Sequence, residues 1–386
     1  MPARRRGPSG APPYNETMHA FDVQVLGAGI VGQSLALALS RLGLRVALRQ
    51  ERPSAARGTD VRAFALNPAS VELLQRLKVW DALPSHAATP VHDMQVHGDA
   101  PGAQIEFSAW QQRVGALAWI TDAAVLEQEL ASAVRFAPHV ELVEGDVDAS
   151  LLALCEGSTS SRRDALGIGF ERHDYGHRAI AARLVSTRPH VGVARQWFRS
   201  PDVLALLPLD TPEPQSSFAL VWSMPAERAD TLLALDAAGF EASLMAATDG
   251  DAGALTLASD RAAWPLQLGR AERWSGPGWA LLGDAAHVVH PLAGQGLNLG
   301  LADVATLARV IVERESWREV GDERLLRRYA RERTVPTWAM GEVTDGLLRL
   351  FAHPSPTLRE LRNRGLTLVN QLPPLKRWLT AQALGS

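Results

Sequence analysis

The strongest constraint on the fold is a glycine-rich hexapeptide, Gly27-Ala-Gly-Ile-Val-Gly32, between a short apolar run and a helical pattern. The apolar run Phe21-Asp-Val-Gln-Val-Leu26 predicts a strand, and the apolar spacing from Ile30 to Leu42 predicts a helix. Arg45-Val-Ala-Leu48 then predicts a second strand. A strand, a tight turn, a helix and a strand over about 30 residues form a β-α-β unit. The chain is therefore predicted to begin with an α/β fold.

The three glycines of this turn fit the G-x-G-x-x-G pattern of a dinucleotide site. Gly27 would make the sharp turn, Gly29 would let the backbone approach a pyrophosphate, and Gly32 would allow close packing of helix on strand. The first N–H groups of the helix would then face the phosphates.

A dinucleotide site usually carries an acidic residue at the end of its second strand, where it binds ribose hydroxyls. Here Gln50 occupies that place and Glu51 follows it. Spacing favours Gln50, because side chains alternate along a strand and Glu51 should point to the other face. A local shift that turns Glu51 inward is the alternative.

A second glycine-rich segment, Gly283 to Gly300, directly follows the apolar run Trp279-Ala-Leu-Leu282. Asp284, at a strand end, can accept hydrogen bonds from the hydroxyls of a sugar alcohol. A helix that opens after Gly294 would direct its N–H groups and the positive end of its dipole toward an electron-rich ring. The residues expected to contact a cofactor here are Gly283, Asp284, Pro291, Gly294, Gln295, Gly296, Leu297 and Asn298.

Composition excludes several classes of protein. With a net charge of −3 and 21% charged residues, the chain has no nucleic-acid-binding signature. Its one cysteine, Cys155, excludes an intrachain disulfide framework and a cysteine-rich zinc site, and fits a reducing compartment. No apolar run reaches the roughly 18 residues that span a bilayer. Residues 1–20 are expected to be a disordered tail, with Met18 as an alternative start, and the protein is expected in the cytoplasm.

At these motifs the sequence resembles the ubiquinone-biosynthesis hydroxylases, a branch of the class A flavin monooxygenases with the para-hydroxybenzoate hydroxylase fold. The resemblance covers nearly the whole chain and rests on both glycine-rich segments and on four further stretches. These are Asp60-Val-Arg-Ala-Phe-Ala-Leu-Asn67, Pro189-His-Val-Gly-Val-Ala-Arg-Gln-Trp-Phe198, Leu361-Arg-Asn-Arg-Gly-Leu366 and Pro374-Leu-Lys-Arg-Trp378.

The resemblance implies FAD as cofactor, NADH or NADPH as reductant, and hydroxylation of a polyprenylated phenol by O2 through a hydroperoxide at flavin C4a. It implies a Rossmann-like FAD-binding domain with an inserted antiparallel-sheet substrate domain and a helical C-terminus. The FAD-binding domain is expected at 21–90, 113–178 and 270–345, the substrate domain at 91–112 and 179–269, and the helical segment at 346–386. Because the implied substrate is a lipid, residues 366–379 are expected either to make peripheral contact with the inner membrane or to pack on the protein itself, and a biosynthetic complex is a further implied partner.

The resemblance also assigns roles to single residues. Arg62 is expected along the FAD pyrophosphate or ribityl chain, and the backbone at Pro291 and Leu292 is expected to face the site of oxygen transfer. His190 is a candidate for the substrate pocket. His287 and His290 are interpreted as structural hydrogen-bonding residues rather than metal ligands, since no third ligand lies nearby.

One departure from the family pattern concerns an Asp-Gly fingerprint that contacts both FAD and nicotinamide. Here Glu156 takes the aspartate position, followed by Gly157, and the hairpin expected before it is shortened to little more than one strand pair between Val140 and Leu154. This departure questions the reductive half of the reaction. A flavin reductase or dehydrogenase without oxygen insertion, and an FAD-bound accessory subunit of a biosynthetic complex, remain the alternatives.

Overall fold

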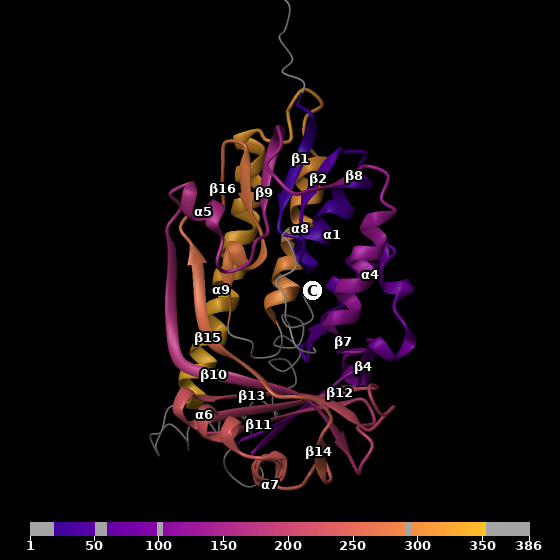
Figure 1. The fold of residues 1–386 in the computed structure, drawn as a ribbon, viewed down its shortest axis with the longest axis vertical. Coiled ribbons are helices and arrows are strands. Elements are labelled where there is room, and N and C mark those ends of the chain that lie inside the picture. Colours follow the sequence, from indigo (N-terminus) through magenta and orange to yellow (C-terminus); the bar gives the residue numbers. More distant parts are fainter. Residues whose placement is uncertain (1–18, 51–59, 99–102, 290–294, 353–386) are drawn as a thin grey trace, which may run out of the picture.

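The computed structural model describes residues 19–50, 60–98, 103–289 and 295–352, of which Gln295, 340–345 and 347–352 are described by their backbone alone. Figure 1 shows a sheet flanked by helices in the upper half of the molecule and a second sheet across the lower half. Chain segments from both ends of the sequence build the upper half.

The upper sheet has six strands, and all are parallel except its edge strand β16, which runs antiparallel to β17. Across the sheet the strands are β16 (Ser275–Gly276), β17 (Trp279–Leu281), β9 (Ala149–Leu154), β1 (Phe21–Leu26), β2 (Val46–Arg49) and β8 (Val140–Val143). The predicted β-α-β unit is present as β1, α1 and β2.

The helices of the upper half are amphipathic or apolar, and they bury their apolar faces in one core. Helix α8 packs against α1, α2 and α9, and α1 also packs against α4. Their bounds are α1 (Ile30–Ser40), α2 (Pro68–Arg76), α4 (Ala123–Arg135), α8 (Gln295–Val312) and α9 (Glu323–Ala352). None of the helices in the described ranges is long and apolar enough to cross a membrane.

The lower sheet has nine strands and is antiparallel except where β5 runs parallel to β11. Along the sheet they are β18 (His287–Val288), β15 (Ala262–Ala271), β10 (Phe170–Ser186), β13 (Ser217–Pro225), β12 (Asp202–Leu209), β11 (Val193–Arg199), β5 (Asp93–His97) and β6 (Gln104–Ser108), with β14 (Leu255–Leu257) beside β10. The two segments assigned to a substrate domain, 91–112 and 179–269, thus meet in one sheet. The sheet also includes Phe170 and His287, outside those ranges.

The two faces of the lower sheet have different neighbours. Helices α6 (Ala226–Ala234) and α7 (Ala237–Thr248) cover one face, where Trp222 and Phe240 lie in the core. The other face packs through Ala194, Leu209 and Ala219 against a small sheet that joins the two halves. That small sheet consists of β3 (Ala63–Leu66), β7 (Ala118–Asp122) and β4 (Ala88–Val91).

Short helices complete the described chain. They are α3 (Ala109–Gln112), α5 (Ser161–Ala165) and the 3-10 turns η1 (Trp80–Ala82), η2 (Ser85–Ala87) and η3 (Gly283–Ala285).

Two local predictions were wrong. A proline inside a helix usually breaks it, so the sequence predicts a break at Pro336 in the C-terminal helical region, but α9 continues through this residue. Contacts in the turn before Pro336 hold the helix, because Arg333 donates to Asp303 and to the Leu299 carbonyl while Thr334 donates to the Ala330 carbonyl. The strand pair expected between Val140 and Leu154 does not form: β8 and β9 pair with β2 and β1 on opposite sides.

Candidate functional site

The glycine turn from Gly27, the Glu156-Gly157 position and the segment from Gly283 meet at one edge of the parallel sheet. The strand register aligns Leu26 of β1 with Leu154 of β9, and Leu154 with Leu281 of β17. Because these strands are parallel, the segments that begin at Gly27, Cys155 and Leu282 leave the sheet side by side. Ligands of open α/β sheets bind at this carboxyl edge.

The glycine turn has the local geometry that close packing requires. Gly27 has a φ of +100°, and a Cβ there would lie 2.4 Å from the carbonyl oxygen of Cys155. A Cβ on Gly32 would lie 1.9 Å from the carbonyl oxygen of Gly27. Both positions therefore exclude any side chain, since such contacts would displace backbone.

Gly29 differs from these two glycines. It is the N-cap residue of α1, and apart from its two chain neighbours no described residue has an atom within 4 Å of the place of its Cβ. No side chain of the described residues caps this helix end, and its first turn has no acidic residue. The free N–H groups and open space fit a bound pyrophosphate.

Asp284 lies in η3, directly after β17. Solvent reaches its side chain, although protein atoms enclose it on most sides, and this enclosure raises the pKa of the carboxyl above its usual value. The described residues offer its carboxylate no hydrogen-bond donor within range. The side chain is thus free to accept hydrogen bonds from a ligand hydroxyl.

A buried carboxylate that the sequence did not reveal supports this segment from below. Asp303 of α8 is fully buried and accepts hydrogen bonds from the Gly283 N–H at 2.9 Å, from His287 Nε2 at 2.7 Å and from Arg333 Nε at 2.6 Å. Burial alone would raise the pKa of Asp303, but the His287 ring and Arg333 outweigh it, so the pKa lies below its ordinary value. This agrees with the interpretation of His287 as a structural residue.

The start of α8 holds four of the residues predicted for cofactor contact, Gln295 to Asn298. Asn298 is buried, and its side chain accepts hydrogen bonds from the Asn67 N–H and the Ser70 hydroxyl while donating to the Ala65 carbonyl. Its side chain therefore joins α8 to β3 and α2. Gly296 and Leu297 lie beside it in the first turn, half-buried.

Arg62 lies close enough to the same cleft for its positive charge to favour the ionised form of the Asp284 carboxyl. Its guanidinium is paired with Asp60 at 2.7 Å and with Glu127 at 3.2 Å, and the hydrogen bond to Asp60 raises the pKa of Arg62. The predicted contact with a phosphate would have to form beside these two carboxylates.

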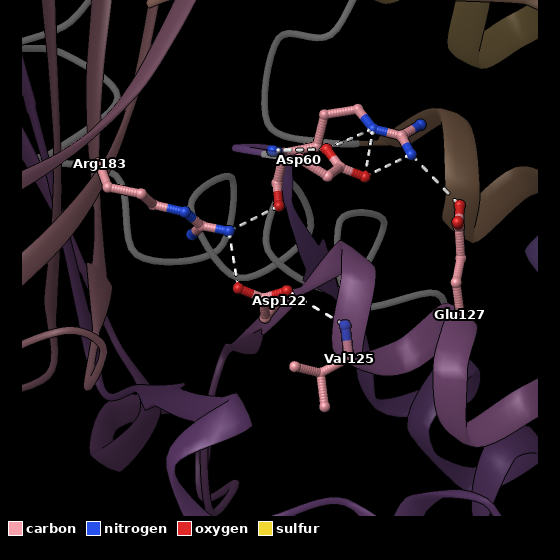
Figure 2. A network of polar contacts seen from close by, with 6 residues as sticks. Asp60, Asp122, Val125, Glu127 and Arg183 are labelled. Carbon is pink, nitrogen blue, oxygen red and sulfur yellow. Dashed lines mark hydrogen bonds and ion pairs between the residues drawn. The ribbon is translucent and has the colours of Figure 1, made fainter. Parts of the chain in front are cut away.

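Figure 2 shows how this network continues into the lower sheet. Arg183 of β10 donates to Asp122 at 2.9 Å and to the carbonyl oxygen of Arg62 at 2.8 Å. Asp122 in turn caps α4 by accepting the Val125 N–H. A buried arginine on the lower sheet thus fixes the backbone beside the candidate cofactor site.

Glu156 and Gly157 follow β9 at the cleft edge, but the Glu156 carboxylate is used within its own segment. It accepts hydrogen bonds from the Ser160 hydroxyl at 2.5 Å and from the Arg162 N–H at 3.3 Å. Arg163, fully buried, links this segment to the second motif by donating to the carbonyls of Ser158 and Ala285.

His190 does not lie free in a pocket. It is buried, its Nδ1 accepts the Gly192 N–H and its Nε2 donates to the Leu209 carbonyl, both at 3.1 Å. Burial lowers the pKa of His190, so the neutral Nε2–H form is favoured. Both ring nitrogens are occupied, and the geometry therefore argues against the predicted role in substrate binding.

The remaining predicted residues are exposed or undescribed. Gln50 follows β2, is exposed, and donates its backbone N–H to Val143. Glu51, Pro291, Leu292 and Gly294, like His290, lie outside the described residues, and Gln295 is described only in its backbone. Within the described ranges, no three His, Cys, Asp or Glu side chains are grouped to hold a metal ion.

The fold and this cleft define a nucleotide-binding α/β protein with a second sheet packed beside the site. A sequence profile of the family described as FAD binding domain matches residues 20–129 and 111–344. The chain therefore belongs to this family, and it is an FAD-dependent oxidoreductase.

Two characterised relatives align over almost the whole chain. Ubiquinone hydroxylase UbiL of Rhodospirillum rubrum is 31% identical over 390 residues, which cover 95% of this chain and 90% of the relative. The 3-demethoxyubiquinol 3-hydroxylase of Escherichia coli is 30% identical over 396 residues, covering 96% and 100%.

Two solved structures illustrate the same fold. The p-nitrophenol 4-monooxygenase PnpA of Pseudomonas putida superposes with a TM-score of 0.74 at 17% identity, covering 95% of this chain and 98% of its own. HpxO of Klebsiella pneumoniae, solved with FAD and uric acid, has a TM-score of 0.70 at 20% identity, covering 94% and 98%.

Proposed function

We propose that this protein is a monooxygenase that hydroxylates the aromatic ring of a polyprenylated phenol in ubiquinone biosynthesis, with NADH or NADPH as reductant and O2 as co-substrate. The main support for this proposal is that the segments beginning at Gly27, Cys155 and Leu282 meet at the carboxyl edge of the parallel sheet, next to a second sheet. The names of the two relatives, which align over more than nine tenths of the chain, support the substrate class.

The residues present fit FAD at this edge. The pyrophosphate would lie at Gly29 and the α1 N-terminus, with Gly27 and Gly32 holding the turn. Asp284 would accept hydrogen bonds from ribityl hydroxyls, and Gln50 from the ribose. Arg62, Gly157 and the backbone from Gly283 and at the start of α8 would complete the site. Bound there, the flavin supplies the electron transfer and oxygen activation that no side chain can supply.

The chain's own contribution is to position the phenol and exclude water. On the sheet face opposite α6 and α7, register places Ala262, Ala181, Val221 and Ala205 in one row across four strands. This face fronts the upper half, and its small side chains leave room for a ring. The ion pair between buried Arg183 and half-buried Asp122 holds the two halves together at one end of this face. The backbone at Pro291 and Leu292 remains our proposal for the opposite wall.

The test is turnover of FAD-loaded protein with a short-chain polyprenyl phenol, NADH or NADPH, and isotopically labelled O2. We expect product that carries one labelled oxygen and substrate-dependent consumption of reductant. Reductant oxidation without labelled product would favour a reductase or dehydrogenase. A yellow protein that neither nicotinamide reduces would favour the accessory subunit.

We also infer that the protein works at the surface of the inner membrane, because the proposed substrate is a lipid. The tail residues 366–379 expected to make this contact lie outside the described residues. Flotation of full-length protein and of a chain ending near Asn363 with anionic vesicles tests this, and equal partition of the two would remove the tail from the contact.

A further inference from the structure

A basic pocket lies on α9, separate from the candidate cofactor cleft. Its volume is about 410 Å³, and it opens between the first turns of α9 and the segment that joins β15 to β16. It is lined by Arg273, Trp274, Ser275, Arg324, Arg327, Ala330 and Arg331.

Only one of the four arginines of this pocket is paired with a carboxylate among the described residues. Arg327 pairs with Glu323 at 2.6 Å. The other three arginines are exposed, and no described carboxylate lies within ion-pair distance of them. A group of guanidinium ions around a concave surface matches a phosphate, because each can donate two parallel hydrogen bonds to its oxygens.

The inner wall of the pocket separates it from the cofactor cleft. Trp274 is buried and stacks on His287 with ring centroids 4.9 Å apart, and His287 bonds to Asp303 below Gly283. The stacked pair therefore lies between the pocket, which Trp274 lines, and the candidate cofactor cleft.

The pocket continues into an apolar stripe on the same helix face. Arg324, Arg327 and Arg331 are followed by Val335 and Trp338, at steps of three and four residues that keep all five side chains on one side of α9. Val335 is 66% exposed and Trp338 is 51% exposed. Basic residues followed by exposed aliphatic and aromatic side chains are typical of a helix face that lies on an anionic membrane.

We propose that the four-arginine pocket binds the phosphate headgroup of an anionic phospholipid, with Val335 and Trp338 contacting the lipid beside it. A soluble phosphate compound has the same recognition chemistry. The choice of a lipid rests on the proposed function, which requires access to a lipid substrate, and on the two exposed apolar residues next to the pocket.

The test is co-sedimentation of the full-length, FAD-loaded protein with vesicles of phosphatidylcholine alone or mixed with phosphatidylglycerol. We expect wild type to bind only the mixed vesicles, and Arg324→Gln/Arg331→Gln to bind them roughly thirtyfold more weakly, because each basic residue near such a surface contributes about fivefold. Trp338→Ser should also weaken binding. The control, Arg76→Gln/Arg135→Gln, removes two exposed arginines elsewhere and should bind like wild type.

Equal binding of wild type and the pocket variant would overturn the proposal. So would a wild type that ignores vesicles but binds inorganic pyrophosphate in a calorimeter, with that binding lost in the pocket variant, since the ligand would then be soluble. None of these measurements needs turnover, so failure here is distinct from failure of the hydroxylation assay.

Discussion

Oδ2 of Asp303 lies 2.7 Å from Nε2 of His287, and the same oxygen accepts the backbone N–H of Gly283 at 2.9 Å. The other oxygen, Oδ1, lies 2.6 Å from Nε of Arg333 on α9. One buried carboxylate thus ties the segment expected to hold the ribityl chain to two helices. The position of Asp284 depends on this support, because Asp284 follows Gly283 directly.

Asp303→Asn should lower both stability and cofactor retention. The substitution leaves the buried Arg333 without its counter-charge, and breaking a buried ion pair costs about 3 kcal/mol or more. Urea unfolding of the apoprotein measures the first effect, and FAD titration measures the second. Glu72→Gln, which breaks the exposed pair with Arg76, is the control and should change stability by less than about 0.5 kcal/mol. An unchanged apoprotein stability in Asp303→Asn would contradict the assigned role.

The Asp303 carboxylate should also make the free energy of unfolding depend on pH in the acid range. Its pKa in the folded protein lies below the ordinary value of 3.8, so the unfolded chain takes up the proton first as pH falls. The stabilisation is therefore complete above that ordinary value and is lost as pH drops through the folded value. Unfolding curves measured at pH 5 and at several values below 3.8 should show a shallower decline with falling pH for Asp303→Asn than for wild type. Parallel declines would argue against it.

Local features of the fold were predictable, because they depend on neighbours in sequence. The run Phe21 to Leu26 and the helix from Ile30 follow from apolar spacing, and both formed. The role of Asp303 was not predictable, since an aspartate within an apolar helix pattern gives no sign of a partner 30 residues away. The prediction at Pro336 was wrong for the opposite reason. Local propensity predicts a break there, and contacts between α9 and α8 override it.

Gly32→Ala should destabilise the apoprotein, and Gly29→Ala should not. At Gly32 a methyl group would lie 1.9 Å from a backbone carbonyl, so α1 must move and the apoprotein should lose several kcal/mol, about the cost of overpacking a core. At Gly29 nothing occupies the space, so the apoprotein should stay within about 1 kcal/mol of wild type. Thermal unfolding of the two apoproteins makes the comparison.

Gly29→Glu extends the same test to the cofactor. A carboxylate placed at the α1 N-terminus would occupy the open space and repel a pyrophosphate, so the protein should fold but purify without flavin. Full yellow colour in this variant would show that the pyrophosphate lies elsewhere.

Asp284→Ala should weaken FAD binding and leave the fold nearly unchanged. The side chain is exposed and makes no hydrogen bond to the described residues, so its loss should cost the apoprotein less than about 0.5 kcal/mol. A hydrogen bond from a ligand hydroxyl to a carboxylate contributes about 1.5 to 3 kcal/mol, which corresponds to roughly tenfold to a hundredfold in affinity. Flavin fluorescence titration measures this, with Asp81→Ala as an exposed control. Core-like destabilisation of Asp284→Ala would make it a structural residue.

The site could be predicted only as a set of segments. Asn298 lies in the predicted segment, yet its side chain joins α8 to β3, because the fold brings Asn67 and Ser70 within hydrogen-bond range. No pattern in the second glycine-rich segment encodes that contact. The same holds for Arg163, whose link to Ala285 spans 122 residues.

The last prediction concerns Glu156, where the chain departs from its family's Asp-Gly fingerprint. Its carboxylate accepts the Ser160 hydroxyl and the Arg162 N–H, so it acts here by holding the segment that follows β9. Glu156→Ala should therefore slow flavin reduction by NADH and NADPH, which stopped-flow absorbance measures. We expect a decrease of about tenfold, because the variant loses the hydrogen bonds to Ser160 and Arg162. Ser160→Ala removes the partner instead and should slow reduction to a similar extent.

Glu156→Asp distinguishes positioning from direct contact. Aspartate is one methylene shorter, and its reach of about 1.5 Å less breaks the contact with Ser160 but keeps the charge. If Glu156 positions the segment, this variant should resemble Glu156→Ala, and Ser160→Ala should add little to either, because coupled residues are not additive. If the carboxylate contacts the nicotinamide or the flavin itself, Glu156→Asp should instead reduce at the wild-type rate or faster. A wild-type rate in Glu156→Ala, with Ser160→Ala slowed, would remove Glu156 from both roles.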